Sequence, residues 1–325
     1  MQREKIFIFG KILEDNIIST NLQFKTDGFC LPLREKTLVS NCLTSLGGGG
    51  ANVAMGFKKL GFLPLVLGMV GKDESGEKAR SILKNAGIRT DFIGASKLLT
   101  GKSIIILAKS KSHVALVYPG ANQSIKAADI EINKIKSCRW WYVLSWGNND
   151  AHIAKKIAEY KQKLGVHLAF NPGKIQLDNP NHISSLIKAT DILFVNEKEL
   201  ETLLNKKIET SDYKKALVEV VGLGPKIVVL TLGSEGSMVY NGAHFYEAPI
   251  MTVKVADGLG AGDAYSSAFL AWFIKSGRID EAIKAGTINS AYVVSKNGAQ
   301  SGQLSKKELA DLVKKEKIYV RISSV

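Results

Sequence analysis

The segment Asp257–Asp263 reads Asp-Gly-Leu-Gly-Ala-Gly-Asp and joins a glycine-rich turn to a carboxylate at each end. We expect a short strand over 253–256 to lead into this turn, and a helix to carry Asp263 in its first turn. Small residues let backbone N–H groups approach a ligand, and the first turn of a helix has unpaired donors. Such a turn can stabilise a transferring phosphoryl group, while Asp263 accepts a proton from an attacking hydroxyl. Helix capping is the alternative for Asp263 alone, but the three glycines and Asp257 favour catalysis.

A second glycine-rich segment, Gly47–Gly50, precedes Ala51 and Asn52. Glycine backbone can lie against a ligand, and the Asn52 amide offers both a donor and an acceptor for sugar hydroxyls. A mobile loop with Asn52 as a helix cap explains the same residues, and both interpretations stay open.

Two further segments follow expected strands. Asn196 and Glu199 have the spacing of a capping box, but a carboxylate there could also organise Mg²⁺ and its waters, because hard cations prefer oxygen ligands. The segment Ile227–Tyr240 reads as a strand, a glycine turn and a second strand, with Thr231, Gly233 and Gly236 at the turn. A tight connection is the simpler interpretation of that turn, although a nucleotide could lie across it.

Two apparent nucleotide motifs fail. Gly258–Gly262 resembles the dinucleotide fingerprint, but its last glycine would fall at Asp263. Ser96–Ser103 resembles a phosphate-binding P-loop, but Ser96 replaces the first glycine, and a β-rich run follows where a helix is required.

The elements alternate between strands and helices, which indicates a mostly parallel sheet covered by helices on both faces. The expected strands are Lys5–Phe9, Leu65–Val70, Trp141–Leu144, Val166–Phe170, Ile192–Val195 and Ile227–Leu230. The expected helices are Asn52–Leu60, Gly76–Ala86, Ala151–Leu164, Lys198–Leu204, Tyr213–Val221, Asp263–Lys275, Ile279–Ser295 and Lys306–Lys314. Residues about 11–45 and 101–118 are β-rich, the latter a hairpin with a polar turn at Lys109–Ser112. Together they predict a small antiparallel sheet that acts as a lid.

Composition limits the functional classes. The chain of 325 residues has a net charge of +14, but its lysines are interspersed with acidic residues, so we expect a basic surface and no nucleic-acid or membrane binding. A basic rim could still attract a nucleotide. No run is long enough to span a bilayer, and the three scattered cysteines, Cys30, Cys42 and Cys138, are expected to be reduced thiols in a cytoplasmic protein.

Taken together, these segments resemble the ribokinase family, the PfkB-type carbohydrate and nucleoside kinases, over nearly the whole chain. The matching segments, in family order, are Gly47–Asn52, Val70–Gly76, Tyr118–Asn122, Asn171-Pro172, Asn196–Glu199, Thr231–Gly236 and Asp257–Asp263. The resemblance implies one three-layer αβα domain over 1–325, with a mostly parallel sheet and a small β lid. It also implies transfer of the γ-phosphoryl group of ATP, with Mg²⁺, to a hydroxyl of a small molecule.

The resemblance further implies roles for individual residues. Asp263 is the base, and the backbone of Gly260, Ala261 and Gly262 forms the anion hole. The residues expected to bind the acceptor are Asp15, Gly48, Gly49 and Asn52. Those expected to contact ATP are Asn196, Thr231, Gly233, Gly236 and Asn297. Glu199 is expected to hold Mg²⁺ through water, and Asp257 is the candidate for a K⁺ site.

Three departures from the family pattern bear on the substrate. Gly258 stands where threonine is usual, which leaves the K⁺ site open, and Leu13 stands where sugar-specific relatives often carry a polar residue. A cluster of Trp140, Trp141 and Trp146 could stack a nucleobase, with core packing as the simpler interpretation. The sequence therefore predicts a sugar kinase. A nucleoside kinase and an inactive binding protein are alternatives, and a homodimer through the lid edge is possible.

Overall fold

Strand β1 (Lys5–Phe9) is buried on both faces because its side chains alternate between two hydrophobic cores. Ile6 and Ile8 pack in one core, and Phe7 and Phe9 pack in the other. A strand buried on both sides requires a helical layer above and below it. The chain therefore folds into three layers, as expected from the sequence.

The computed structural model describes residues 3–20, 34–108 and 113–324. Within these ranges, ten strands form the large sheet in the order β14-β13-β12-β11-β10-β9-β8-β1-β4-β5. Besides β1 they are β4 (Leu63–Gly71), β5 (Ile93–Ser96), β8 (Trp140–Leu144), β9 (His167–Asn171), β10 (Ile192–Asn196), β11 (Ile227–Thr231), β12 (Ser237–Tyr240), β13 (His244–Ala248) and β14 (Arg321–Ser324). The strands from β5 to β11 are parallel, and β12, β13 and β14 extend the sheet in antiparallel fashion.

Helices cover both faces of this sheet. One face carries α1 (Gly49–Lys59), α2 (Glu74–Asn85), α9 (Ala261–Ser276), α10 (Ile279–Val294) and α11 (Lys306–Lys315). The other carries α3 (Ile132–Ile135), α4 (Ala151–Leu164), α5 (Lys174–Leu177), α6 (Pro180–Ala189), α7 (Glu197–Leu204) and α8 (Tyr213–Gly222). None of the helices in the described ranges combines the length and apolar character needed to cross a bilayer.

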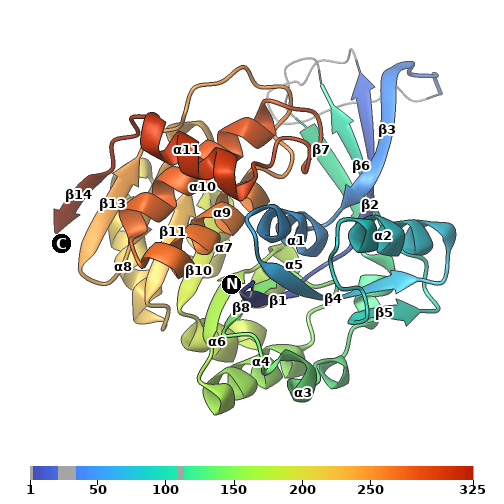
Figure 1. Ribbon diagram of the computed structural model, residues 1–325, viewed down its shortest axis with the longest axis horizontal. Helices are drawn as coiled ribbons and strands as arrows, with labels where there is room; N and C mark the ends of the chain where they lie inside the picture. The colour runs from blue at the N-terminus through green and yellow to red at the C-terminus, as the bar shows by residue number, and fades with distance from the viewer. Residues whose placement is uncertain (1–2, 21–33, 109–112, 325) are drawn as a thin grey trace.

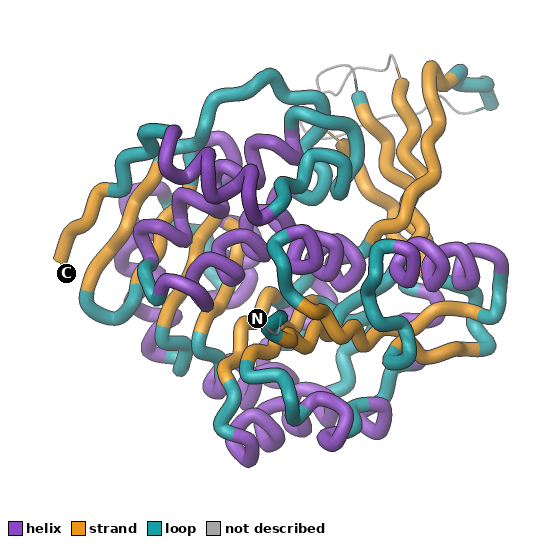
Figure 2. The backbone as a smooth tube through the Cα atoms, viewed as in Figure 1, coloured by secondary structure: helices purple, strands orange, loops and turns teal. Residues whose placement is uncertain are grey.

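Four strands form a separate small sheet that projects from one end of the molecule (Figure 1; Figure 2). Its order is β3-β2-β6-β7, and its strands are β2 (Leu13–Thr20), β3 (Val39–Gly47), β6 (Gly101–Leu107) and β7 (His113–Tyr118). The hairpin expected over 101–118 is present as β6 and β7, although its predicted turn at Lys109–Ser112 lies outside the described residues, as does the part of the predicted lid at 21–33.

The expected antiparallel character of this small sheet is wrong in one respect. The two central strands, β2 and β6, pair in parallel, with Asp15 opposite Ser103. Both strands leave the large sheet at the same end and run in the same direction, so two antiparallel pairs join through a parallel one.

The strand expected over 253–256 is absent from the structure. The N–H groups of Ala256 and Asp257 donate to the carbonyl of Val294, at the end of α10, instead of joining the sheet. The neighbouring edge of β13 is already paired with β14. The segment therefore crosses the end of the sheet as an extended loop.

Strand β1 lies at the point where the strand order reverses. The chain passes from β1 to β4 on one side, and later returns to β8 on the other. In open α/β sheets, ligands bind in the crevice outside the carboxyl ends of the strands at such a point. The backbone just beyond β1 is fixed there, because Gly10 N donates to Leu67 O at 3.1 Å and Lys11 N donates to Ser145 O at 3.2 Å.

Candidate active site

The glycine-rich turn before α9 has the conformation that its sequence requires. Gly260 is the N-cap of α9 with a φ of 71°, and a Cβ there would lie 2.5 Å from the Ala299 Cβ. Positive φ and this close approach both favour glycine. Asp263 is the third residue of the helix, in its first turn.

Asp257 holds the same turn against the loop that follows α10. Its side chain is buried and accepts hydrogen bonds from Leu259 N at 2.9 Å and from Gly298 N at 2.7 Å. Asp257 therefore connects the turn to the segment that contains Asn297, which is itself exposed.

A hydrogen-bonded chain orients the Asp263 carboxylate. Asn52 Nδ2 donates to Asp263 Oδ2 at 2.9 Å, and Gln300 Nε2 donates to Asn52 Oδ1 at 2.9 Å. Because Gln300 donates to the side-chain oxygen of Asn52, the side-chain nitrogen of Asn52 faces Asp263. Gln303 Nε2 holds the backbone carbonyl of the same asparagine at 3.1 Å.

The surroundings of Asp263 favour a proton acceptor. The side chain is partly exposed, yet burial among the neighbouring atoms raises the pKa of its carboxyl, and the charge of Asp15 raises it further. The Asn52 hydrogen bond and the positive charge of Lys11 act in the opposite direction. The raised pKa makes the carboxylate a stronger base than an exposed aspartate.

The residues expected to bind the acceptor lie around this carboxylate. Helix α1 begins inside the glycine run, with Gly48 as N-cap at a φ of 86°, so Asn52 is a residue of the first turn and does not cap the helix. A Cβ on Gly49 would lie 3.5 Å from Asp263 Oδ1, which places that glycine against the candidate base.

Asp15 reaches the same region from β2. Ser103 Oγ donates to Asp15 Oδ1 at 2.5 Å, and burial raises the pKa of Asp15. Gly47 leaves room for this side chain, since a Cβ there would lie 1.8 Å from Asp15 Oδ2. The small sheet thus carries a carboxylate into the site.

The residues expected to contact the nucleotide lie at the carboxyl ends of β10 and β11. Asn196 and Thr231 are opposite each other in these two strands. Gly233 and Gly236 form the turn between β11 and β12, with φ values of 53° and 98°. A Cβ on Gly236 would lie 2.1 Å from Ala248 O, so only glycine fits that turn.

Glu199 completes a capping box with Asn196. Glu199 N donates to Asn196 Oδ1 at 3.0 Å, and Asn196 N donates to Glu199 Oε2 at 2.9 Å. The capping interpretation is therefore confirmed. Burial, with the charge of Asp263 as a further contribution, raises the pKa of Glu199 to about 7. Glu199 is thus within electrostatic reach of Asp263 and titrates near neutral pH.

Three residues near Asp263 were not predicted. Lys11 lies two residues beyond β1, and its charge acts on Asp263. Its position just after an expected strand could have indicated a ligand-binding role. Gln300 had no signal, because its role depends on a contact with a residue 248 positions away. Tyr142 in β8 is fully buried, and its hydroxyl has no hydrogen-bond partner among the described residues. Burial raises the pKa of this hydroxyl, and the charges of Asp263 and Glu199 raise it further.

Other predicted features lie away from the site. Trp141 and Trp146 are fully buried, and Trp140 stacks on His167 at the opposite end of the strands; core packing is confirmed for the first two. Cys42 and Cys138 are free thiols, and Cys30 lies outside the described residues. The described part of the chain contains no group of three or more His, Cys, Asp and Glu side chains that could hold a metal ion.

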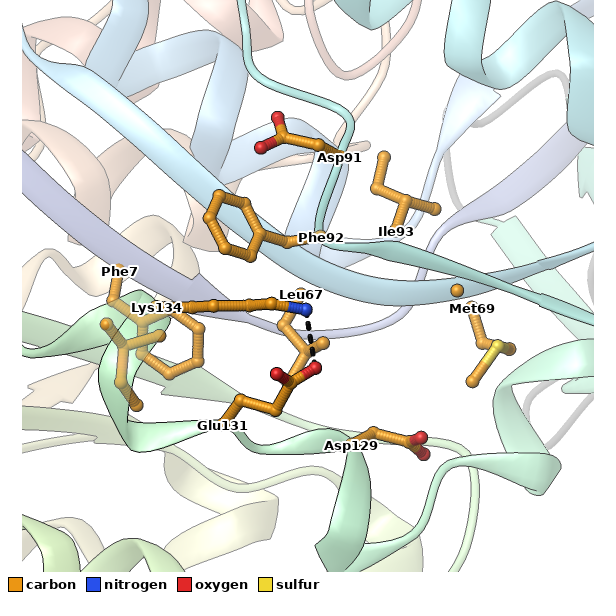
Figure 3. Close-up of a pocket in the computed structure, with 11 residues that line it drawn as sticks. Phe7, Leu67, Met69, Asp91, Phe92, Ile93, Asp129, Glu131 and Lys134 are labelled. Carbon is orange, nitrogen blue, oxygen red and sulfur yellow. Dashed lines mark hydrogen bonds and ion pairs between the residues drawn. The ribbon is translucent and has the colours of Figure 1, made fainter.

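A separate cavity of about 140 Å³ opens between β4, β5 and the segment 129–135 (Figure 3). Phe7, Leu67 and Met69 contribute apolar lining, and Lys134 and Glu131, which also line the cavity, form an ion pair with each other. None of the candidate catalytic or ligand-binding residues lines this cavity.

The chain was compared with known proteins. The model of the pfkB family of carbohydrate kinases matches residues 6–307. An uncharacterized sugar kinase of Archaeoglobus fulgidus is 27% identical over 76% of this chain and 98% of its own length. A nucleoside kinase of Methanothermobacter thermautotrophicus is 25% identical over 78% of this chain and 80% of its own length.

Solved structures share the fold. The ribokinase of Arabidopsis thaliana, solved with ribose and ATP, superposes with a TM-score of 0.80 at 21% identity and covers 96% of this chain and 99% of its own. The expected ribokinase-like fold is therefore confirmed. The protein belongs to the pfkB family of carbohydrate kinases, phosphotransferases with an alcohol group as acceptor, and is a sugar or nucleoside kinase.

Proposed function

We propose that this protein transfers the γ-phosphoryl group of ATP to a hydroxyl of a sugar, with Asp263 as general base. The observation that carries the proposal is the Asp263 carboxylate, held by Asn52 at the N-terminal turn of α9 beside the carboxylate of Asp15. A base that is oriented by a neighbour and has a raised pKa suits proton abstraction from a sugar hydroxyl.

The two substrates would meet at Asp263 from opposite sides. ATP would lie over the ends of β10 and β11, against Asn196, Thr231, Gly233 and Gly236, with Asn297 at its edge. The acceptor would lie at the switch point, against Asp15, Gly48, Gly49 and Asn52. The backbone N–H groups of Gly260–Gly262, at the positive end of α9, would stabilise charge on the transferring group.

Mg²⁺ fits this arrangement as a partner of the nucleotide. A hydrated ion bound mainly by phosphates needs only one or two carboxylates from the protein, and Glu199 is the residue that would hold its waters. When bound, Mg²⁺ neutralises charge on the phosphates. Asp257 accepts two backbone hydrogen bonds that anchor the turn, and its remaining lone pairs keep it the candidate for a K⁺ site.

The small sheet would act as a lid, because it carries Asp15 and stands beside the proposed acceptor subsite. It also exposes apolar side chains, among them Leu43, Ile104 and Leu116. We infer that a second copy of the chain covers this surface in a homodimer. Sedimentation of the wild type and of Leu116→Lys tests this, and a monomeric wild type refutes it.

A panel of pentoses, hexoses and nucleosides with ATP tests the function. We expect turnover of a sugar acceptor, and in Asp263→Asn a loss of roughly 10²- to 10⁴-fold in kcat with the fold retained. Near-normal turnover of this variant refutes the assignment of the base. Preference for a nucleoside supports the nucleoside kinase alternative, and ATP binding without turnover of any acceptor supports an inactive binding protein.

A further inference from the structure

Lys11 lies beside the residues of the proposed acceptor subsite, and its charge acts on Asp263. It lies just beyond β1, at the point where the strand order reverses, and its backbone N–H donates to Ser145 O at the end of β8. Its carbonyl accepts from Gly50 N at 3.0 Å, at the start of α1. Contacts to two separate elements therefore fix the backbone of Lys11 in the crevice where ligands bind in such sheets.

The ammonium group of Lys11 has no partner in the described part of the protein. It forms no hydrogen bond there and no ion pair within 4.0 Å, although the residue is partly buried. Burial lowers the pKa of its ammonium group, and the charge of Asp263 acts in the opposite direction. Buried charges are normally paired, so the missing partner of Lys11 is expected to arrive with a ligand.

The strand order assigns that ligand to the acceptor side. Strands β8 and β9 separate β1 from β10, where the proposed nucleotide subsite begins. Neighbouring strands are about 4.8 Å apart, so the end of β1 is roughly 14 Å from that of β10. The acceptor, which meets Asp15 and Asn52, lies nearer to Lys11 than the adenosine part of ATP does.

The charges around the acceptor lead to the same conclusion. A neutral sugar needs only hydrogen-bonding groups, which Asp15, Ser103 and Asn52 already supply. An unpaired ammonium adds nothing to the recognition of such a sugar, and its desolvation is unfavourable. An anionic group on the acceptor would compensate for that desolvation and provide a charge-assisted hydrogen bond.

We propose that the acceptor is an anionic sugar, a sugar phosphate or a sugar acid, whose charged group binds the Lys11 ammonium. This inference rests on the proposed function and narrows its substrate class. Lys11 is then a specificity-determining residue, while Asp263 remains the base that takes the proton from the acceptor hydroxyl.

The test compares kcat/KM for neutral and anionic acceptors. The neutral arm holds ribose, fructose and adenosine, and the anionic arms hold ribose 1-phosphate and fructose 6-phosphate as phosphates and gluconate as a carboxylate. We expect the wild type to prefer one anionic arm by at least about 100-fold. Lys11→Met should lower kcat/KM for that acceptor by roughly 10²- to 10³-fold, and Lys11→Arg should restore much of it.

Lys102→Met is the matched control. Lys102 lies on β6, one residue before Ser103, but its ammonium already pairs with Glu14 Oε1 at 3.1 Å. Removing this charge should leave the preference for anionic acceptors within about twofold, because an ion pair with an exposed partner contributes little. Thermal unfolding of each variant checks that the fold is retained.

Three results overturn the inference. A wild type that prefers neutral acceptors refutes it and leaves the proposed function intact. An equal loss on neutral and anionic acceptors in Lys11→Met assigns Lys11 to the transferring phosphoryl group instead. Binding of ATP without turnover of any acceptor in either arm refutes the proposed function, and the inference with it.

Discussion

The hydrogen bond from Asn52 to Asp263 should set the pH at which the enzyme becomes active. Asn52→Leu keeps the approximate size of the side chain and removes the donor. Because the donor lowers the pKa of Asp263, its loss should raise that pKa. A general base works only when it is deprotonated, so the acid limb of the pH–rate profile should move to higher pH.

The size of this effect follows from the bond that is lost. Asn52 Nδ2 lies 2.9 Å from Asp263 Oδ2, and a hydrogen bond to a charged group contributes about 1.5–3 kcal/mol. One pH unit corresponds to about 1.4 kcal/mol, so the midpoint of the acid limb should move by about 1–2 pH units. At a pH below both midpoints, the variant should be about 10- to 100-fold slower for this reason alone.

The assay is kcat as a function of pH at saturating ATP and acceptor. Asn52 is also proposed to bind the acceptor, and loss of that contact alone would lower kcat/KM by the same factor at every pH. Gln300→Leu should move the limb less, because the Asn52 amide remains but is free to turn. Gln303→Leu, which removes a contact to the Asn52 backbone carbonyl, should leave the midpoint in place. An unchanged midpoint in Asn52→Leu would refute the reasoning.

Three further predictions concern residues of the same site. The folded-state pKa of Asp263 is raised, so the ionised form costs stability once the pH exceeds the unfolded value near 4. Asp263→Asn should therefore unfold at a higher temperature than the wild type, by a margin that grows as the pH rises above 4 and levels off above the folded-state pKa. With the pKa of Glu199 at about 7, the apparent affinity for Mg²⁺ with ATP should rise between pH 6 and pH 8, and Glu199→Gln should lose this dependence while keeping the cap of α7. A Cβ on Gly258 would meet no atom within 4 Å, so Gly258→Ala should raise the free energy of unfolding by about 0.4–1 kcal/mol. Gly260→Ala should lower it by about 1–3 kcal/mol. Urea unfolding measures both, and equal effects would contradict the argument.

Several helices and strands could be predicted because their capping residues and apolar patterns match the side chains that are buried in the fold. The predicted helix Ala151–Leu164 matches α4 at both ends, where Asp150 caps its start and Gly165 ends it with a φ of 62°. The strand Lys5–Phe9 was also correct at both ends, since a run of large apolar residues in a sheet covered on both sides is unmistakable.

The errors occur where tertiary contacts override the local pattern. Val253 and Val255 alternate with other residues as in a strand, yet Val255 is 45% exposed and the following N–H groups bond to Val294. Strand β14 was missed because its side chains are mostly exposed at the edge of the sheet, so it carries no hydrophobic signal.

The candidate site was predictable to the extent that single segments contain it. Asp263 and its glycines, and Asn52 after its own glycines, could be found from spacing within one turn. The hydrogen-bonded chain from Gln300 through Asn52 to Asp263 could not be found in this way. It joins three segments that meet only after β1, α1 and α9 have packed together.

Because the sequence reveals features within one segment more readily than contacts between segments, the chemistry is easier to infer than the substrate. The proposed base and anion hole belong to the start of one helix, so their geometry is set locally and follows from a short motif. The proposed acceptor subsite combines Asp15 from the small sheet, Asn52 from α1 and Lys11, which lies just beyond β1. A single substitution at any of these positions changes the charge or shape of the proposed subsite and shifts the pKa of Asp263, but it leaves the glycine-rich turn before α9 in place. We therefore expect the fold to preserve phosphoryl transfer, while Lys11, two residues beyond β1, would decide in our proposal whether the acceptor must carry a charge.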